Sequence, residues 1–444
     1  MANGFAHRTL TGWISEFVTR PLPGKWPQIP LDDATLADLA AHFDLCRDSG
    51  YNEVVIWGFF VDREWPLDIV SCVDDDRRAR IARTIGAAHA RGLKIHTGLG
   101  IYSWGFDEII RAHPHLSRGN PRVMCPAVAD SRVWMEKIVD FVVGEFPFDG
   151  LNMQSADLGR CRCDDCWDIA DLEYHARLNA QVADYIHARW PGKLLIVDNW
   201  GCPVGGEAQL PSLAALSTRV GYIIDPDNSA ARQGGREFRR RAIEALQCPF
   251  GTLAGKSVWP PQRWPASKWF LPTTLVNVDY VRELYEDGGR AVEQFVTNLA
   301  NPSGEVSLRF MGALISEVTA QPQKLLADAV ERTYRTRDAS TRDGLADLFA
   351  RAEQAHFSHS GRDLGPQIGL MYLDGGLMPK QDPSPETYLL DMPAADLSAY
   401  AAAICGVAKD FEKLRAGIGD AAKADLTARC FESVLADAQR IGSR

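Results

Sequence analysis

The residues with the clearest chemical potential lie in the segment FDGLNMQSADLGRCRCDDCW, which spans Phe148–Trp167. A short apolar strand pattern leads to an isolated carboxylate, Asp157, and the cysteine array CxCxxC follows it closely. A parallel β/α barrel presents its catalytic groups in the loops that follow its strands. The segment therefore predicts a catalytic acid, Asp157, in a loop whose shape is fixed by its neighbours.

Three further acids end or follow strand-like runs: Asp198 after LLIV, Asp225 in IIDPDN and Glu293 in AVEQF. Glycoside cleavage needs one carboxyl group that protonates the departing oxygen and a second that acts as nucleophile or base. We expect Asp157 to be the proton donor and Asp198 or Glu293 to be its partner, with Asp225 as a further candidate. The structural alternatives are an Asx turn for Asp157, a cap or ion pair for Asp198, and an ordinary turn for Asp225.

Aromatic and amide side chains gather at the same predicted strand ends. Sugars stack their C–H faces on aromatic rings and need hydrogen bonds from amides and carboxylates. Arg160 could meet a carboxylate on an acidic sugar, and His96 is either a site residue or a satisfied interior histidine. The predicted substrate-binding residues are Trp57, His96, Trp104, Asn152, Gln154, Arg160, Asn199, Trp200 and Trp259.

The cysteines Cys161, Cys163 and Cys166 have a spacing that lets three thiolates converge on one Zn²⁺, one ligand short of a closed structural site. Cys125 or Cys202 could complete the set, and three reduced cysteines that merely pack a loop are the alternative. If zinc binds there, we expect it to be a structural ion that staples the Asp157 loop, with no cofactor required for catalysis.

The elements that must position these residues alternate between strand-like and helix-like runs, which is typical of a parallel α/β fold. The sequence predicts a (β/α)8 TIM barrel, because no Gly-rich phosphate loop follows the first strand as an open doubly wound sheet would require. The predicted strands are 8–18, 53–57, 93–99, 148–154, 194–197, 220–224, 250–253 and 291–296, and the predicted helices are 31–49, 74–91, 107–113, 131–145, 174–190 and 236–246.

The character of the chain changes after residue 304 to Ala-, Leu- and Glu-rich helical patterns at 305–332, 340–357, 394–415 and 420–440, interrupted by a Gly- and Pro-rich loop at 361–393. We expect a catalytic barrel at 1–304 and an α-helical C-terminal extension at 305–444. The extension is a candidate interface for a homodimer.

Composition and charge argue against some classes of binding partner and indicate a cellular compartment. The 444 residues carry a formal net charge of −10, which argues against nucleic acid or an anionic membrane surface as a general partner. No apolar run reaches the ~18 residues of a membrane span, and the N-terminus lacks the pattern of a secretion signal. The scattered cysteines suit a reducing compartment, so we expect a cytoplasmic enzyme that acts on an oligosaccharide or glycoside.

The order of strand, Asp, Gly, Arg and CxCxxC, followed by a helix and LLIVDNW, resembles the barrel domain of alpha-glucuronidase-like glycoside hydrolases and related bacterial families. HPHL, the later CP pair and LRFMGALISEVTAQPQKLLADAVERTYR are also similar to segments of those proteins, so the resemblance covers roughly residues 90–335. It implies an intracellular, exo-acting barrel glycosidase in which Asp157 corresponds to the acid after the fourth strand. The sequence departs from the alpha-glucuronidases proper in lacking an evident N-terminal β domain and a matched Glu general acid, so the resemblance leaves a uronic acid substrate open.

Together these patterns predict a glycoside hydrolase. Two alternatives stay open. A metal-dependent sugar isomerase or aldolase would use His96, Asp157, Asp198 and Asp225 as a ligand set. A non-catalytic carbohydrate- or zinc-binding protein would use the acids at the strand ends only to hold its ligand.

Overall fold

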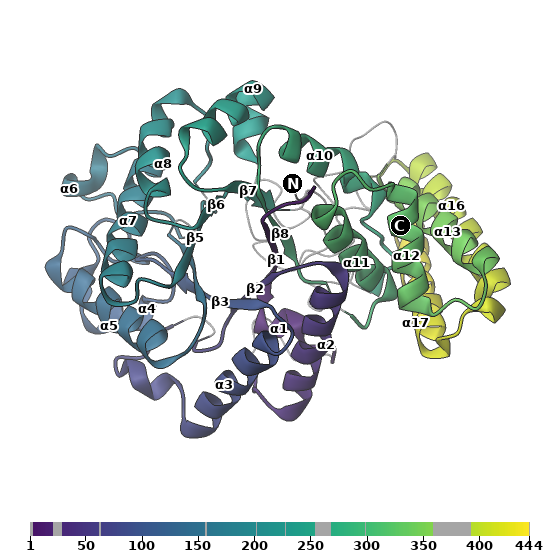
Figure 1. The fold of residues 1–444 in the computed structure, drawn as a ribbon, viewed down its shortest axis with the longest axis horizontal. Coiled ribbons are helices and arrows are strands. Elements are labelled where there is room, and N and C mark those ends of the chain that lie inside the picture. The colour runs from purple at the N-terminus through teal and green to yellow at the C-terminus, as the bar shows by residue number, and fades with distance from the viewer. Residues whose placement is uncertain are drawn as a thin grey trace.

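The eight strands of the protein close into one parallel barrel in the order β1 to β8, as the sequence predicts. A computed structural model describes residues 3–20, 29–61, 64–155, 158–200, 202–226, 228–253, 268–297, 299–357 and 392–443. Figure 1 shows the ring of strands with helices around it, and the C-terminal helices grouped against one side. The fold is a (β/α)8 TIM barrel with a C-terminal helical extension.

The strands are short and mostly buried on both faces, which is typical of parallel sheets covered by helices. Their bounds are β1 His7–Trp13, β2 Glu53–Trp57, β3 Lys94–Gly100, β4 Gly150–Gln154, β5 Leu194–Asp198, β6 Tyr222–Ile224, β7 Phe250–Leu253 and β8 Ala291–Phe295. All eight predicted strands are present. The first ends earlier than predicted, because Ile14–Phe17 turns into a short helix, α1, after Trp13.

The helices around the barrel are α2 Asp33–Ser49, α3 Asp75–His89, α4 Asp107–Ala112, α5 Ala129–Glu145, α6 Asp164–Trp167, α7 Asp171–Arg189, α8 Leu210–Ser217, α9 Ser229–Ala245 and α10 Val278–Glu286. The prediction omitted α6, α8 and α10. All three are short, at 4, 8 and 9 residues, so none offers many turns of apolar periodicity from which to recognise it.

Helix ends follow the local capping chemistry. The Asp32 carboxylate accepts a hydrogen bond of 2.8 Å from the backbone N–H of Thr35 at the start of α2, and Asp74 does the same for Arg77 at the start of α3. Gly50 ends α2 at φ +96°, a left-handed conformation that a side chain disfavours. These signals place the long helices at the positions that the sequence predicts.

The C-terminal extension contains α11 Pro302–Ser316, α12 Pro322–Tyr334, α13 Ala339–Phe357, α16 Ala394–Leu414 and α17 Ala421–Gly442. The single helix predicted at 305–332 is two helices, since the chain leaves helical geometry at Glu317 and Pro322 begins α12. Helix α11 packs on α2 of the barrel and on α12 and α17 of the extension. The boundary at residue 304 and the homodimer interface stay predictions.

The extension also holds the segment that follows β7. The His356 side chain on α13 donates a 2.8 Å hydrogen bond from Nε2 to the Phe270 carbonyl, and the Phe270 ring stacks on Phe431 of α17 at 4.3 Å. The Trp269 indole N–H donates to Asp437 of α17 at 2.9 Å. A loop on the barrel is thus anchored by helices from the other end of the chain.

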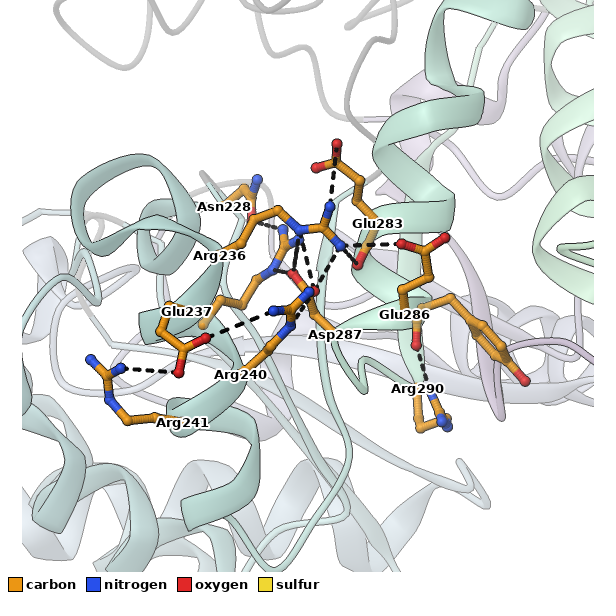
Figure 2. Close-up of polar contacts among 11 residues, drawn as sticks. Asn228, Arg236, Glu237, Arg240, Arg241, Glu283, Glu286, Asp287 and Arg290 are labelled. Carbon is orange, nitrogen blue, oxygen red and sulfur yellow. Dashed lines mark hydrogen bonds and ion pairs between the residues drawn. The ribbon is translucent and has the colours of Figure 1, made fainter.

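A charge cluster ties α9 to the turn before β8 (Figure 2). The buried carboxylate of Asp287 accepts hydrogen bonds from Arg236, Arg239 and Arg240, three arginines of one helix. Arg239 is itself only 1% exposed and also donates to Asn228. Because each charge is hydrogen-bonded, the cluster offsets the cost of burying ions.

Among the residues that the structure describes, no helix combines the length and the apolar character needed to cross a bilayer. The cytoplasmic location stays a prediction.

Candidate functional site

The candidate site lies at the C-terminal ends of the strands, where barrels of this kind carry their binding groups. Of the residues predicted from the sequence, Asp157 and Trp259 lie outside those that the structure describes. The others occupy three different places: the strand ends, the inside of the barrel, and the connections outside it.

Three tryptophans form an aromatic cluster at the strand ends. The ring of Trp13, the last residue of β1, lies 5.5 Å from that of Trp57 at the end of β2 and 5.0 Å from that of Trp104 in the turn after β3. Trp13 and Trp57 are register partners in the sheet, so their side chains point to the same face. The Trp57 ring lies over Gly98, where a Cβ atom would approach its Cδ2 to 1.9 Å. The glycine therefore makes the room that this ring occupies.

Asp198 ends β5 beside Gln154, the last residue of β4 and its register partner. The Asp198 carboxylate accepts a hydrogen bond of 3.1 Å from the backbone N–H of Trp200, which fixes its orientation. Trp200 packs edge-on against Phe295 at the end of β8, 6.2 Å between centroids. Asn199 is buried, and its Nδ2 has no acceptor among the described residues. These strand ends thus offer one carboxylate, two amides and two aromatic rings.

Glu293 lies inside the barrel, opposite Asn152. The Asn152 Nδ2 donates to Glu293 Oε1 at 3.3 Å, and both side chains are buried. Burial and the nearby negative charge of Glu53 raise the pKa of Glu293 to about 8. A carboxyl group with such a pKa keeps its proton at neutral pH and can donate it, which is the property of a general acid.

A second acid, Glu53, sits deeper in the barrel. Its Oε1 meets His7 Nδ1 at 2.7 Å, and its Oε2 lies 3.1 Å from the Tyr222 hydroxyl and 3.3 Å from His96 Nε2. Although burial opposes it, hydrogen bonding from His7 and His96 holds the pKa of Glu53 well below its usual range. The pKa values of the two buried acids, Glu293 and Glu53, therefore lie far apart. His96 belongs to this interior network, not to the strand ends, which is the interior alternative that the sequence left open.

Asp225 follows β6 and caps α9. Its carboxylate accepts a hydrogen bond of 2.5 Å from the Ser229 hydroxyl and one of 2.9 Å from the Ala230 backbone N–H. The sequence left an ordinary turn open as the alternative for Asp225, and the structure gives its carboxylate a structural task at the start of α9.

Arg160 is 3% exposed and turned into its own loop. Its guanidinium donates to the backbone carbonyls of Cys166 and Ile169 and to the Asp171 carboxylate, and it lies 4.7 Å from the Tyr174 ring centroid. With its donors used in this way, Arg160 organises the cysteine loop, and the geometry does not favour contact with a substrate carboxylate.

The cysteine array gains its fourth member from the connection between β3 and α5. The Sγ atoms of Cys125, Cys161, Cys163 and Cys166 all lie within 4.8 Å of one another, and those of Cys125 and Cys163 are 3.7 Å apart. Four thiols at these separations could bind a metal ion such as zinc. Of the two fourth ligands that the sequence offered, Cys125 belongs to the cluster and Cys202 does not.

The sequence reasoning missed Trp13, Glu53 and Tyr222 as members of the site and its support. Trp13 was missed because the first strand was predicted to continue through it to Val18. The alternating residues His7, Thr9 and Thr11 share a face of the strand with Trp13. Glu53 gave a usable signal, an acid at the start of the otherwise apolar run EVVIW. An acid inside a strand with both faces buried needs a partner.

No protein-family model and no curated protein matches the sequence. Solved structures match the fold. A GH138 enzyme targeting pectin rhamnogalacturonan II aligns with 98% of this chain at TM-score 0.62 and 9% identity, and this chain spans 57% of its length. A mutant of the Thermobaculum terrenum O-GlcNAc hydrolase aligns with 93% of this chain and 77% of its own, at TM-score 0.52 and 10% identity. CpGH84B aligns with 96% of this chain and 66% of its own, at TM-score 0.51 and 9% identity.

At these identities the matches show the fold alone, a (β/α)8 barrel. They do not show the activity, and the resemblance to alpha-glucuronidase-like enzymes stays a prediction.

Proposed function

We propose that the protein is a glycoside hydrolase that removes sugars from the end of an oligosaccharide. The observation that carries the proposal is the pairing, at one end of the barrel, of the Trp13, Trp57 and Trp104 cluster with the oriented carboxylate of Asp198. Aromatic rings bind the C–H faces of sugars, and a carboxylate at the same end of the barrel supplies the chemistry that a glycosidic bond needs. Two solved structures of similar fold, one named as a GH138 enzyme targeting pectin rhamnogalacturonan II and one as an O-GlcNAc hydrolase, support the same class.

The acid–base roles follow from the positions of the carboxyl groups. Asp157 comes three residues after the end of β4, and Asp198 ends the neighbouring strand β5. In the proposal Asp157 protonates the departing oxygen and Asp198 acts as nucleophile or base. Glu293 is the alternative partner. Its hydrogen bond to Asn152 and its raised pKa support instead a protonated group beneath the site.

The amide groups at the strand ends complete the proposal. Gln154 lies beside Asp198, and the unsatisfied Nδ2 of Asn199 is a buried donor of the kind that a sugar hydroxyl satisfies. In this proposal bond cleavage uses no metal ion, and a metal at the four cysteines has a structural task.

The alternative of a metal-dependent isomerase has less geometric support. Within the described part of the chain, the group of potential metal ligands is the cysteine cluster. His96 is engaged with Glu53 inside the barrel, and Asp225 caps α9. These two members of the required ligand set have other partners, and so no specific observation favours that chemistry.

The two carboxylates are tested by Asp157→Asn and Asp198→Asn on any glycoside that the wild type cleaves. Each substitution should lower kcat by several orders of magnitude without unfolding the protein, because it removes a proton donor or a nucleophile and keeps the shape. Asp184→Asn, a change at an exposed acid on α7, is the matched control and should leave kcat unchanged. Near wild-type kcat in both Asp157→Asn and Asp198→Asn would refute the assignment.

A further inference from the structure

We infer that Cys125, Cys161, Cys163 and Cys166 bind one Zn²⁺ ion as a closed tetrathiolate site. The four residues come from two separate connections of the barrel. Cys125 precedes α5, whereas the other three lie between β4 and α7, with Cys166 on the short helix α6. Residues 36 positions apart in the chain therefore converge on one point only because the barrel folds.

The spacing of the sulfur atoms fits a tetrahedral ion. A Zn–S bond of about 2.3 Å places the sulfurs of a tetrahedral site about 3.8 Å apart. The Cys125 and Cys163 Sγ atoms are 3.7 Å apart, and every pair in the cluster lies within 4.8 Å. A disulfide needs sulfurs about 2.05 Å apart, so the arrangement corresponds to ligands around a common centre.

Backbone groups contact the sulfurs. The Asp165 N–H interacts with the Cys163 sulfur and the Cys163 N–H with the Cys161 sulfur, and the Cys161 Sγ also contacts the Arg118 carbonyl. N–H donors of this kind stabilise negative charge on a ligand and orient it, as outer-shell groups do at metal sites. The turn that brings them together includes a hydrogen bond of 2.8 Å from the Cys166 N–H to the Cys163 carbonyl.

Two arginines lie near the cluster. Four thiolates around Zn²⁺ carry a net charge of −2, which is costly to bury without compensation. Arg160 is buried against the carbonyls of Cys161 and Cys166, and Arg118 lies close enough to interact electrostatically with Cys163 and Cys125. Each guanidinium is also paired with a carboxylate, Arg160 with Asp171 and Arg118 with Asp165, so the two groups offset only part of that charge.

Because all four ligands are protein thiolates, the ion has a structural role. Four protein thiolates fill a tetrahedral shell and leave no open position for water or substrate. The ion joins the connection before α5 to the loop after β4, so it fixes the course of that loop. If the proposed function holds, this is the loop that carries Asp157. The binding of zinc does not depend on that proposal.

The first experiment measures metal in the full chain, purified without chelators, by plasma mass spectrometry. We expect one zinc per chain, and at most a trace in Cys125→Ser and Cys166→Ser. Cys202→Ser is the matched control, a buried cysteine outside the cluster that should leave the zinc content unchanged. Equal zinc in Cys125→Ser and wild type, or iron in place of zinc in the wild type, would overturn the inference.

A second measurement needs no variant and so does not depend on how well one folds. Cobalt(II) exchanged into the wild-type protein should give the intense sulfur-to-metal charge-transfer absorption and visible bands of a tetrahedral tetrathiolate site. Zinc that chelators leave bound should be released when a reagent modifies the cluster, and four thiols should become reactive at that point. A chain with no bound metal and a disulfide within the cluster would contradict the site. A chain that holds zinc but shows no glycosidase activity would instead count against the proposed function.

Discussion

The Asn152 amide donates a hydrogen bond of 3.3 Å to the Glu293 carboxyl group, and it does so across the barrel, because β4 and β8 are four strands apart in the closed ring of eight. The contact joins opposite walls inside the barrel. Because Glu293 is buried and Glu53 carries negative charge nearby, the raised pKa of Glu293 keeps its proton in place into the neutral range. The barrel interior thus contains one neutral and one charged acid.

Glu293→Gln should change how stability depends on pH. The pKa of Glu293 is about 8 in the folded chain, above its ordinary 4.5, so the folded state holds a proton that the unfolded state releases. Stability of the wild type therefore falls as pH rises between these two values, by up to about 1.4 kcal/mol per pH unit. Gln keeps the acceptor for Asn152 and has no proton to lose. Urea unfolding at several pH values should show the variant gaining on the wild type from pH 5 to pH 8, and a constant difference would contradict the raised pKa.

Gly98→Ala should disturb the aromatic cluster. The new Cβ would lie 1.9 Å from Trp57 Cδ2, so the indole ring must shift. Overpacking of this kind costs about 1–3 kcal/mol, and a displaced platform should raise KM more than it lowers kcat. Gly86→Ala on α3 is the control, because its Cβ would meet nothing within 4 Å and should stabilise the helix by about 0.5–1 kcal/mol. Unchanged KM and stability in Gly98→Ala would show that Trp57 is not constrained as described.

Asp287→Asn should destabilise the protein at pH 7 by about 3–5 kcal/mol, because it leaves the buried Arg239 guanidinium without its counter-charge. Although burial opposes it, hydrogen bonds from Arg236 and Arg239 lower the pKa of Asp287. Its contribution is thus present above its ordinary pKa of 3.8 and is lost as pH falls through the folded value. Thermal unfolding should show the gap to wild type closing only in acid. Glu237→Gln, which affects an exposed pair with Arg241, should change little.

Glu353→Gln tests whether the C-terminal helices hold the segment after β7. The Glu353 carboxylate on α13 accepts hydrogen bonds from the backbone N–H groups of Thr274 and Val276. Gln has one acceptor oxygen, so one buried N–H should lose its partner at a cost of about 1–3 kcal/mol. Gln354→Ala, at the exposed neighbouring position, is the control for the helix itself. Equal unfolding midpoints for the two variants would mean that this contact does not stabilise the fold.

Much of the fold was predictable because strand and helix periodicity are local. EVVIW and FGTL became strands with the bounds expected, and the long helices begin near Asp32 and Asp74 as capping chemistry requires. The positions in space were not predictable. Whether Cys125 or Cys202 joins the other cysteines, and whether His96 faces a substrate or Glu53, depends on contacts that exist only after the strands close. Asp225 and Arg160 show a different limit, since neighbours close in sequence use their polar atoms in a local geometry that the residue types alone do not reveal.

The central claim is that the strand-end carboxylates cleave a glycosidic bond without a metal. The most direct measurement is hydrolysis of a panel of neutral and acidic, α- and β-linked glycosides and oligosaccharides by the purified chain, with and without EDTA. We expect release of terminal monosaccharide from one class of substrate at a rate that EDTA leaves unchanged over the assay. Turnover that is lost with EDTA and restored by a divalent cation, or isomerised sugar as the product, would contradict the account.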